Sequence, residues 1–133
     1  MCRDFDPAPL GEGTLESLVD AATRAPSAGN THGLGFVALE GEHTATYWEV
    51  TLPHERRADF AWPGLLSAPL LLLVYVEPGA WARRYGEADK ASTGLGELGA
   101  WPVPYWFVDA GASVMAILLA AEDLGLGALF FGQ

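Results

Sequence analysis

Basic residues and cysteine are scarce in this sequence. Its 133 residues hold seven Lys and Arg against seventeen Asp and Glu, which gives a formal net charge of −10. Nucleic-acid phosphates need clustered basic groups, so this balance excludes a nucleic-acid partner. Cys2 is the single cysteine, which excludes an internal disulfide framework and a thiolate metal cluster. An anionic ligand would have to be held by a few local Arg side chains, helix N-termini or backbone N–H groups.

We expect neither a membrane span nor a secretion signal. The apolar run at 114–121 is too short to cross a bilayer. The first ten residues are charged and proline-rich, unlike a signal peptide. With 50% hydrophobic residues, the chain can bury one core. The expectation is therefore a single domain in the cytoplasm.

Hydrophobic periodicity predicts an α+β fold. Apolar residues at helical spacing from Leu15 indicate a first helix, with Thr14 as its N-cap and an end before Pro26. Strands are expected at Leu34–Glu40 and at Leu70–Val76, the second with a length that suits burial on both faces. The other expected elements are a helix at 43–52, a polar connector or short helix at 55–62, an aperiodic surface excursion at 79–103, a helix at 109–124 stopped by Gly125, and a strand at 128–131. Helices would pack against a mixed sheet of the three strands.

The segment at 24–32 joins the first helix to the first strand and is the best candidate for a binding loop. Pro26 cannot continue a helix, and Ser27 and Asn30 offer side-chain donors and acceptors. Ala28 and Gly29 would let a ligand approach the backbone closely. On local chemistry alone, a plain helix stop followed by a loop is the favoured interpretation.

The context of this loop favours a functional interpretation. Further segments stand in a fixed order around it, at 3–7, 35–39, 104–109 and 125–132. Together with Pro26-Ser27-Ala28-Gly29-Asn30, they resemble the nitroreductase family of FMN oxidoreductases along nearly the whole chain. Family members begin earlier and run on further, so the resemblance implies a single nitroreductase-like domain at 1–133 that is incomplete at both ends.

The resemblance also implies a homodimer with FMN in two sites at the interface, to which the apolar helix at 109–124 would contribute. Arg3 would meet the flavin phosphate or ribityl chain. Pro26, Ser27 and Asn30 would line the ribityl chain and ring, and the backbone of Phe131 and Gly132 would lie beside the reactive edge of the ring.

A flavin would carry the redox chemistry itself, so no catalytic side chain is expected. NAD(P)H would donate a hydride, and a small electron-poor acceptor such as a nitroaromatic or quinone would receive the electrons. The acceptor pocket would include His32, Tyr105 and Trp106. His32 departs from the Gln that is common in the family and would add pH dependence. Two alternatives stay open: a truncated non-catalytic relative, and a flavin-binding branch that dehalogenates substrates or breaks down flavin.

Other motifs carry less weight. The glycine-rich stretch at 94–99 matches a dinucleotide fingerprint in letters, but no strand precedes it and no helix follows. The three histidines have no metal-ligand spacing, so no metal is expected. Tyr105 and Trp106, with Trp101, are equally well interpreted as core or as pocket wall. Arg84 and Lys90 are interpreted as solvated rather than substrate-binding.

Overall fold

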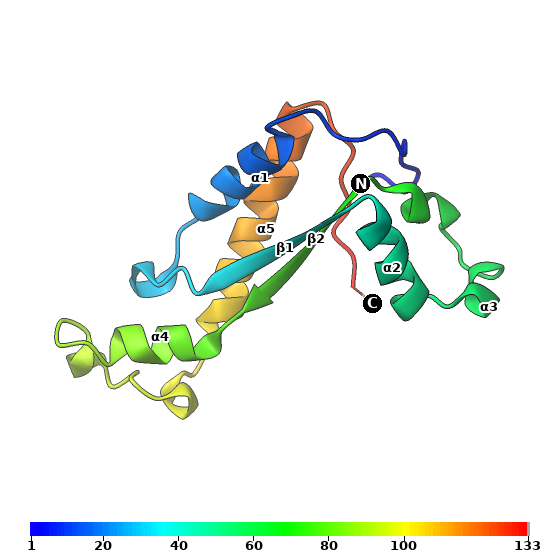
Figure 1. The fold of residues 1–133 in the computed structure, drawn as a ribbon. Coiled ribbons are helices and arrows are strands. Elements are labelled where there is room, and N and C mark those ends of the chain that lie inside the picture. The colour runs from blue at the N-terminus through cyan, green and yellow to red at the C-terminus, as the bar shows by residue number, and fades with distance from the viewer. Residues whose placement is uncertain (133) are drawn as a thin grey trace.

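A two-stranded antiparallel sheet crosses the middle of the molecule, in a computed structural model that describes residues 1–132 (Figure 1). The strands are β1 (Leu34–Glu40) and β2 (Leu70–Val76), and both have the predicted bounds. Their register pairs Leu34 with Val76 at one end and Glu40 with Leu70 at the other. The α+β class is confirmed, but the sheet is purely antiparallel rather than mixed.

One face of the sheet is covered by two helices, α1 (Thr14–Thr23) and α5 (Tyr105–Asp123) (Figure 1). Their shared core contains Leu18, Ala22, Ile117 and Ala121, against which Phe36 and the N-terminal part of β2 pack. Residue 13 caps α1 in place of Thr14, because a left-handed glycine can end the incoming loop without a side-chain bond.

A second core lies on the opposite face of the sheet. It contains Trp48, Leu52, Leu65 and Leu71, contributed by β2, by α2 (Glu42–Thr51) and by the short turn η2 (Pro63–Ser67). A third short helix, α3 (His54–Arg57), lies between α2 and η2. The predicted helix at 43–52 and the connector at 55–62 are therefore confirmed within a few residues.

This second core covers only one end of the sheet, so the expectation that β2 is buried on both faces is wrong. Leu71 is buried, but Leu73 is 38% exposed and Tyr75 is 57% exposed on the same face. The apolar run of β2 thus reflects partial burial of one face along the whole strand, and burial of the other face only at its start.

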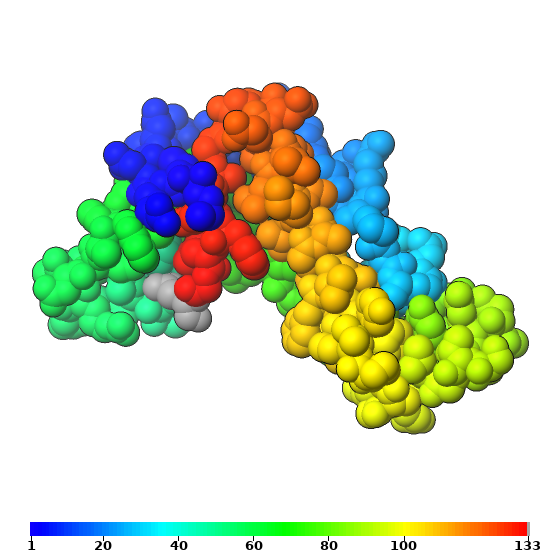
Figure 2. Space-filling view, turned by 180° about the vertical axis from the view of Figure 1, so that it is seen from behind, coloured from blue at the N-terminus to red at the C-terminus, as the bar shows by residue number. Residues whose placement is uncertain are grey.

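The predicted strand at 128–131 does not form. This stretch is extended, but it pairs with neither β1 nor β2. The Cys2 N–H donates to the Ala128 carbonyl at 2.9 Å, so the segment runs beside the N-terminal residues (Figure 2). The Phe131 ring stacks on Trp48 at 5.8 Å between centroids. The apolar side chains of the segment at 128–131 therefore pack against the core, and its backbone does not join the sheet.

The stretch expected to be a surface excursion contains a helix with a buried anchor. It is α4 (Pro78–Tyr85), and the side chain of its Trp81 is fully buried. Short turns follow, η3 (Ala91–Thr93) and η4 (Leu98–Ala100), and the glycine-rich stretch at 94–99 begins between them. A helix of eight residues with one buried side chain shows no periodicity, which explains why the sequence pattern missed it.

Helix α5 begins four residues earlier than predicted, which places Asp109 in its second turn. The helix ends as expected at Gly125, whose φ is +71°. The Leu126 N–H donates to the Ala121 carbonyl at 2.8 Å, which completes a Schellman cap. The resulting 19-residue helix is long and apolar enough to cross a membrane by length and composition, which the shorter apolar run did not suggest.

The two sides of α5 differ in character. Its packed side carries Asp109 and Ser113, both buried, one and two turns from the helix start. Its other side is open along much of its length (Figure 2). Val108, Met115 and Leu119 are each more than half exposed there.

Candidate functional site

The loop between α1 and β1 has an unusual backbone. It contains a short turn, η1 (Ala28–Asn30), and Gly29 has a φ of +65°. Asn30 and His32 also have positive φ, at +56° and +49°. Left-handed backbone is uncommon for residues with a side chain, although Asn tolerates it better than most. The surrounding structure must therefore hold this loop in place.

Asp109 anchors the start of the loop. Its Oδ2 accepts a hydrogen bond from the Ser27 hydroxyl at 2.8 Å and from the Ala28 N–H at 2.8 Å. The Trp81 Nε1–H donates to the same oxygen at 2.9 Å. Asp109 is only 6% exposed, so three segments meet at one buried carboxylate: the loop, α4 and α5.

The hydroxyl of Ser27 is used twice inside the loop. It donates to Asp109, and its oxygen accepts the His32 N–H at 3.0 Å. A serine hydroxyl has one hydrogen, so Ser27 has none left to donate to a ligand. Asn30 differs in its side chain. Its Oδ1 lies 2.7 Å from His32 Nε2, and its side-chain nitrogen Nδ2 has no partner within residues 1–132.

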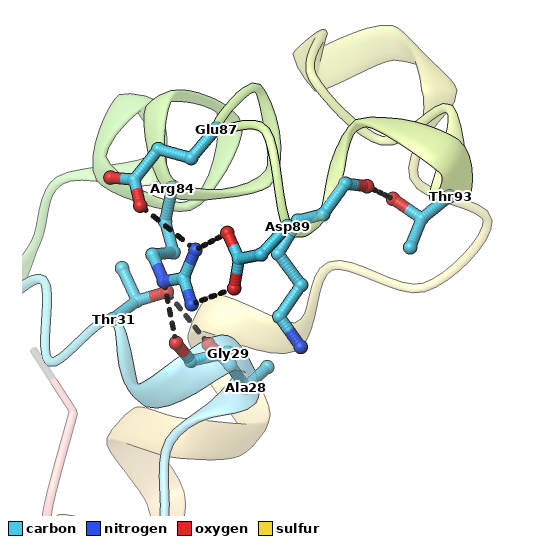
Figure 3. A network of polar contacts seen from close by, with 8 residues as sticks. Ala28, Gly29, Thr31, Arg84, Glu87, Asp89 and Thr93 are labelled. Carbon is cyan, nitrogen blue, oxygen red and sulfur yellow. Dashed lines mark hydrogen bonds and ion pairs between the residues drawn. The ribbon is translucent and has the colours of Figure 1, made fainter.

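Arg84 holds the middle of the loop from the side of α4 (Figure 3). Its Nε donates to the Gly29 carbonyl at 2.9 Å, and its two terminal nitrogens bind the two Asp89 oxygens at 2.8 Å each. A further bond reaches Glu87 at 2.9 Å. The Arg84 side chain is 24% exposed, so its interpretation as a solvated residue is wrong. Its hydrogen bond and charge hold the pKa of Asp89 below its usual range.

An aromatic cluster lies against the same loop. A Cβ on Gly29 would come within 2.6 Å of the Tyr85 ring, so any other residue here would have to displace that ring. Tyr85 in turn packs edge-on against Trp101 at 4.7 Å between centroids. Tyr105 and Trp106, in the first turn of α5, lie 6.0 and 5.9 Å from Trp101. Trp101 is buried, whereas Tyr105 is 43% exposed.

The remaining predicted residues line a cavity of about 200 Å³ at the other end of the molecule. The Arg3 guanidinium lies 5.4 Å from the centroid of the Trp62 ring. Within residues 1–132, Arg3 forms no ion pair. The other lining residues are Met1, Phe60, Leu65, Leu129, Phe130, Phe131 and Gly132.

One chain therefore does not bring all the predicted cofactor residues together. Pro26, Ser27 and Asn30 lie at the junction of α1 and β1, and none of them lines the cavity beside Arg3. Figure 1 places that junction at the opposite end of the sheet from the two termini. The predicted acceptor-pocket residues His32, Tyr105 and Trp106 lie with the loop.

Sequence reasoning missed the residues that hold the loop. Asp109 has a signal in the sequence, because it is the one charged residue between positions 105 and 121 of the apolar helix. Trp81 has no local signal. His43 and His54 are exposed. Within residues 1–132, no cluster of three or more His, Cys, Asp or Glu could hold a metal ion.

Comparison with known proteins then identifies the family. The sequence model of the Nitroreductase family matches residues 1–133. This chain belongs to the nitroreductase family. No curated protein matches it significantly.

Solved structures of nitroreductase-like proteins share the fold. A nitroreductase family protein from Clostridium novyi NT is 20% identical with a TM-score of 0.64, and the match covers 92% of this chain and 59% of that one. A protein from Clostridium acetobutylicum described as an NADH oxidase is 21% identical with a TM-score of 0.60, covering 92% and 58%. A protein from Exiguobacterium sibiricum described as a nitroreductase in complex with FMN is 16% identical with a TM-score of 0.54, covering 94% and 75%. The chain thus spans less than two thirds of the first two.

Proposed function

We propose that this chain binds FMN and acts as an oxidoreductase that passes electrons from NAD(P)H to a small electron-poor acceptor in the cytoplasm, such as a nitroaromatic or a quinone. The observation that carries the proposal is the nitroreductase family match over the whole chain. Related structures support the cofactor, since one of them was solved in complex with FMN.

The residues at the site fit a flavin mononucleotide in part. Arg3 has no ion-pair partner within residues 1–132 and lines a cavity that also contains aromatic side chains, in a chain with a net charge of −10. A phosphate is the group that such a cation binds well. Asn30 offers amide N–H groups to a polar chain or ring edge. Ser27 does not fit the expected role as a side-chain donor, because its hydrogen is held by Asp109.

We assign the flavin to a composite site between two copies of the chain. The cavity of about 200 Å³ is smaller than typical cofactor sites, and the loop that carries Asn30 lies elsewhere in the same chain. A homodimer would place the Arg3 cavity of one copy beside the loop of the other. The exposed apolar side chains of α5, Val108, Met115 and Leu119, are the surface that a second copy would cover.

The protein residues act by placement and charge. Bound FMN supplies hydride acceptance and electron release. Arg3 would neutralise the phosphate, Asn30 would bind the ligand through its side-chain amide, and the backbone of Phe131 and Gly132 would face the ring. His32, Tyr105 and Trp106 would form the wall against which the acceptor packs.

The visible absorption spectrum of the purified protein, before and after addition of FMN, tests the cofactor. Retained flavin together with oxidation of NADH or NADPH in the presence of a nitroaromatic would support the full proposal. A protein that stays colourless and does not quench FMN fluorescence would favour the non-catalytic alternative. Bound flavin without nicotinamide oxidation would favour a branch with a different reaction.

Mixed dimers test the composite site. Arg3→Ala and Asn30→Gly would each impair both flavin sites of a homodimer. If each site takes Arg3 from one copy and Asn30 from the other, a mixed dimer regains one intact site and carries one doubly altered site. If both residues act within one copy, every site of the mixed dimer still carries one substitution. Recovery of tight FMN binding upon mixing decides between the two arrangements. Glycine is chosen to replace Asn30 because it keeps the left-handed backbone at that position.

A further inference from the structure

Asp109 is a buried carboxylate on the packed side of an apolar helix, and it makes its bonds away from that helix. The loop supplies two donors, Ser27 and Ala28, and α4 supplies the third through Trp81. All three donors are neutral. A charge taken out of water among neutral donors is costly, so an apolar side chain would suit the stability of α5 better. The carboxylate must therefore serve the loop.

We infer that Asp109 is a positioning residue, which holds the loop at 27–32 in its left-handed conformation and thereby sets the affinity of the site for flavin. Its consequence for flavin rests on the proposed function, but its effect on the loop does not. The residue does not touch the ligand in this arrangement. It acts through Ser27 and Ala28, whose polar hydrogens it fixes.

The strain of the loop makes such an anchor necessary. Gly29, Asn30 and His32 all have positive φ, and the last two have side chains that disfavour this region. Asp109 orients the Ser27 hydroxyl, whose oxygen then accepts the His32 N–H. The bonds run from Asp109 through Ser27 to His32, and they close the loop at both of its ends.

Asp109 binds the Ser27 hydroxyl and the Ala28 N–H, and it does not bind the side chains of Asn30 and His32. Asn30 and His32 are both exposed, and they contact each other at 2.7 Å. If the Asp109 oxygen is removed, Asn30 and His32 can relax to negative φ. Their side chains then no longer point in their present directions, and the Asn30 amide is lost to the cofactor without any change in residue 30 itself.

Three variants separate positioning from packing. Asp109→Leu removes the acceptor and keeps a side chain of similar size. Asp109→Asn keeps an acceptor oxygen, whose two lone pairs can still receive two of the three donors. Ser113→Ala is the matched control, because Ser113 is a buried polar residue one turn along the same face of α5 that makes no bond to the loop.

Two measurements are made on each variant: the dissociation constant for FMN, and hydrogen exchange of the backbone amides at 28–32 in the FMN-free protein. We expect Asp109→Leu to weaken FMN binding about ten- to a hundredfold, the loss expected for one or two hydrogen bonds to a carboxylate. We expect it to speed exchange in the loop, and Asp109→Asn to restore binding to within a few fold of the wild type. Ser113→Ala should leave both measurements unchanged.

The outcomes are distinguishable from failure of the proposed function. If the wild type binds no FMN, that function is wrong, and loop exchange alone decides the role of Asp109. If Asp109→Leu does not fold, Ser27→Ala breaks the same chain of bonds and takes its place. The inference is overturned if loop exchange in the variant equals that of the wild type, or if Asp109→Asn is as impaired as Asp109→Leu.

Discussion

Trp81 at the loop end and Trp48 at the cavity end are the two most deeply buried tryptophans, and their indole N–H groups are used in opposite ways. Trp81 is fully buried and its Nε1–H donates to Asp109 at 2.9 Å. Trp48 is 2% exposed and stacks on Phe131, but its Nε1–H has no partner within residues 1–132. The loop end thus combines ring packing with hydrogen bonds to a buried carboxylate, whereas Trp48 at the cavity end contributes ring packing alone within the described residues.

The difference indicates which end requires exact geometry. Hydrogen bonds to a carboxylate fix direction, whereas ring packing tolerates small displacements. The loop carries short polar side chains that must point correctly to be useful. The cavity carries a long, exposed Arg3 that can adjust to a phosphate, and therefore needs only a supporting surface such as the Trp62 ring.

The largest expected effect comes from matched substitutions of the two tryptophans. Trp81→Phe removes a donor to a buried charge, whereas Trp48→Phe removes a donor that already lacks a partner. Both shrink a buried ring by the same amount. We therefore expect Trp81→Phe to lower the free energy of unfolding by roughly 2–4 kcal/mol more than Trp48→Phe does. Urea unfolding followed by circular dichroism measures both, and equal losses would contradict the comparison.

The next largest effect is expected at the cavity end, where Arg3→Ala should lower the affinity for FMN more than the stability of the fold. Arg3→Ala should weaken FMN binding by about 1.5–3 kcal/mol, because it removes a charge-assisted contact with the phosphate. Within residues 1–132, Arg3 has one ring contact, with the exposed Trp62, and a contact of this kind contributes about 0.5–1 kcal/mol. Titration of FMN and thermal melting of the FMN-free protein should therefore respond unequally. A melting point that falls while affinity holds would make Arg3 a structural residue.

A smaller difference in the free energy of unfolding is expected between substitutions of two glycines with positive φ, Gly29 and Gly125. Gly29→Ala and Gly125→Ala both place a side chain at positive φ, which costs roughly 1–2 kcal/mol at each position. Only the Cβ at position 29 meets a ring, that of Tyr85, and nothing lies within 4 Å of the Cβ at position 125. The free energy of unfolding should fall by about 1–2 kcal/mol more for Gly29→Ala, because of overpacking. Chemical denaturation of the two variants would show equal losses if Tyr85 can move aside.

The smallest expected effect concerns acid. Arg84 lowers the pKa of Asp89, so the folded protein binds the Asp89 proton less readily than the unfolded chain does. Their bond therefore stabilises the fold above the ordinary Asp pKa, and the contribution is lost as the pH falls through the lowered value. Asp89→Asn should reduce the melting temperature slightly at neutral pH, and the difference from the wild type should begin to shrink below about pH 4 and vanish once the pH is below the lowered pKa of Asp89. A difference that persists in acid would contradict this assignment.

Local patterns were sufficient to predict the regular elements with strong periodicity or a clear stop. The strands at Leu34–Glu40 and Leu70–Val76 have apolar runs of strand length bounded by Gly and Pro. Gly125 ended the last helix as predicted, because a left-handed residue is needed there. The apolar run at 128–131 looked equally like a strand, but whether it pairs depends on a free sheet edge beside it, which no local pattern reports.

The candidate site was predictable in its residues and not in its arrangement. The resemblance picked out Pro26, Ser27 and Asn30, and the structure places them where a helix meets a strand. Ser27 and Asp109 are 82 positions apart in sequence, so the bond that fixes the loop leaves no periodic trace. The separation of Arg3 from the loop could not be predicted from the sequence either. It arises because the two lie at opposite ends of the folded sheet.

The pairing of α1 with α5 also determines when this chain can fold during synthesis. Helix α1 ends at Thr23 and leaves the ribosome well before its partner α5, which begins at Tyr105. A ten-residue helix is marginal alone in water, so Leu18 and Ala22 stay exposed until α5 has been made. Contacts between segments so distant in sequence form slowly, so this core is expected to assemble late in folding.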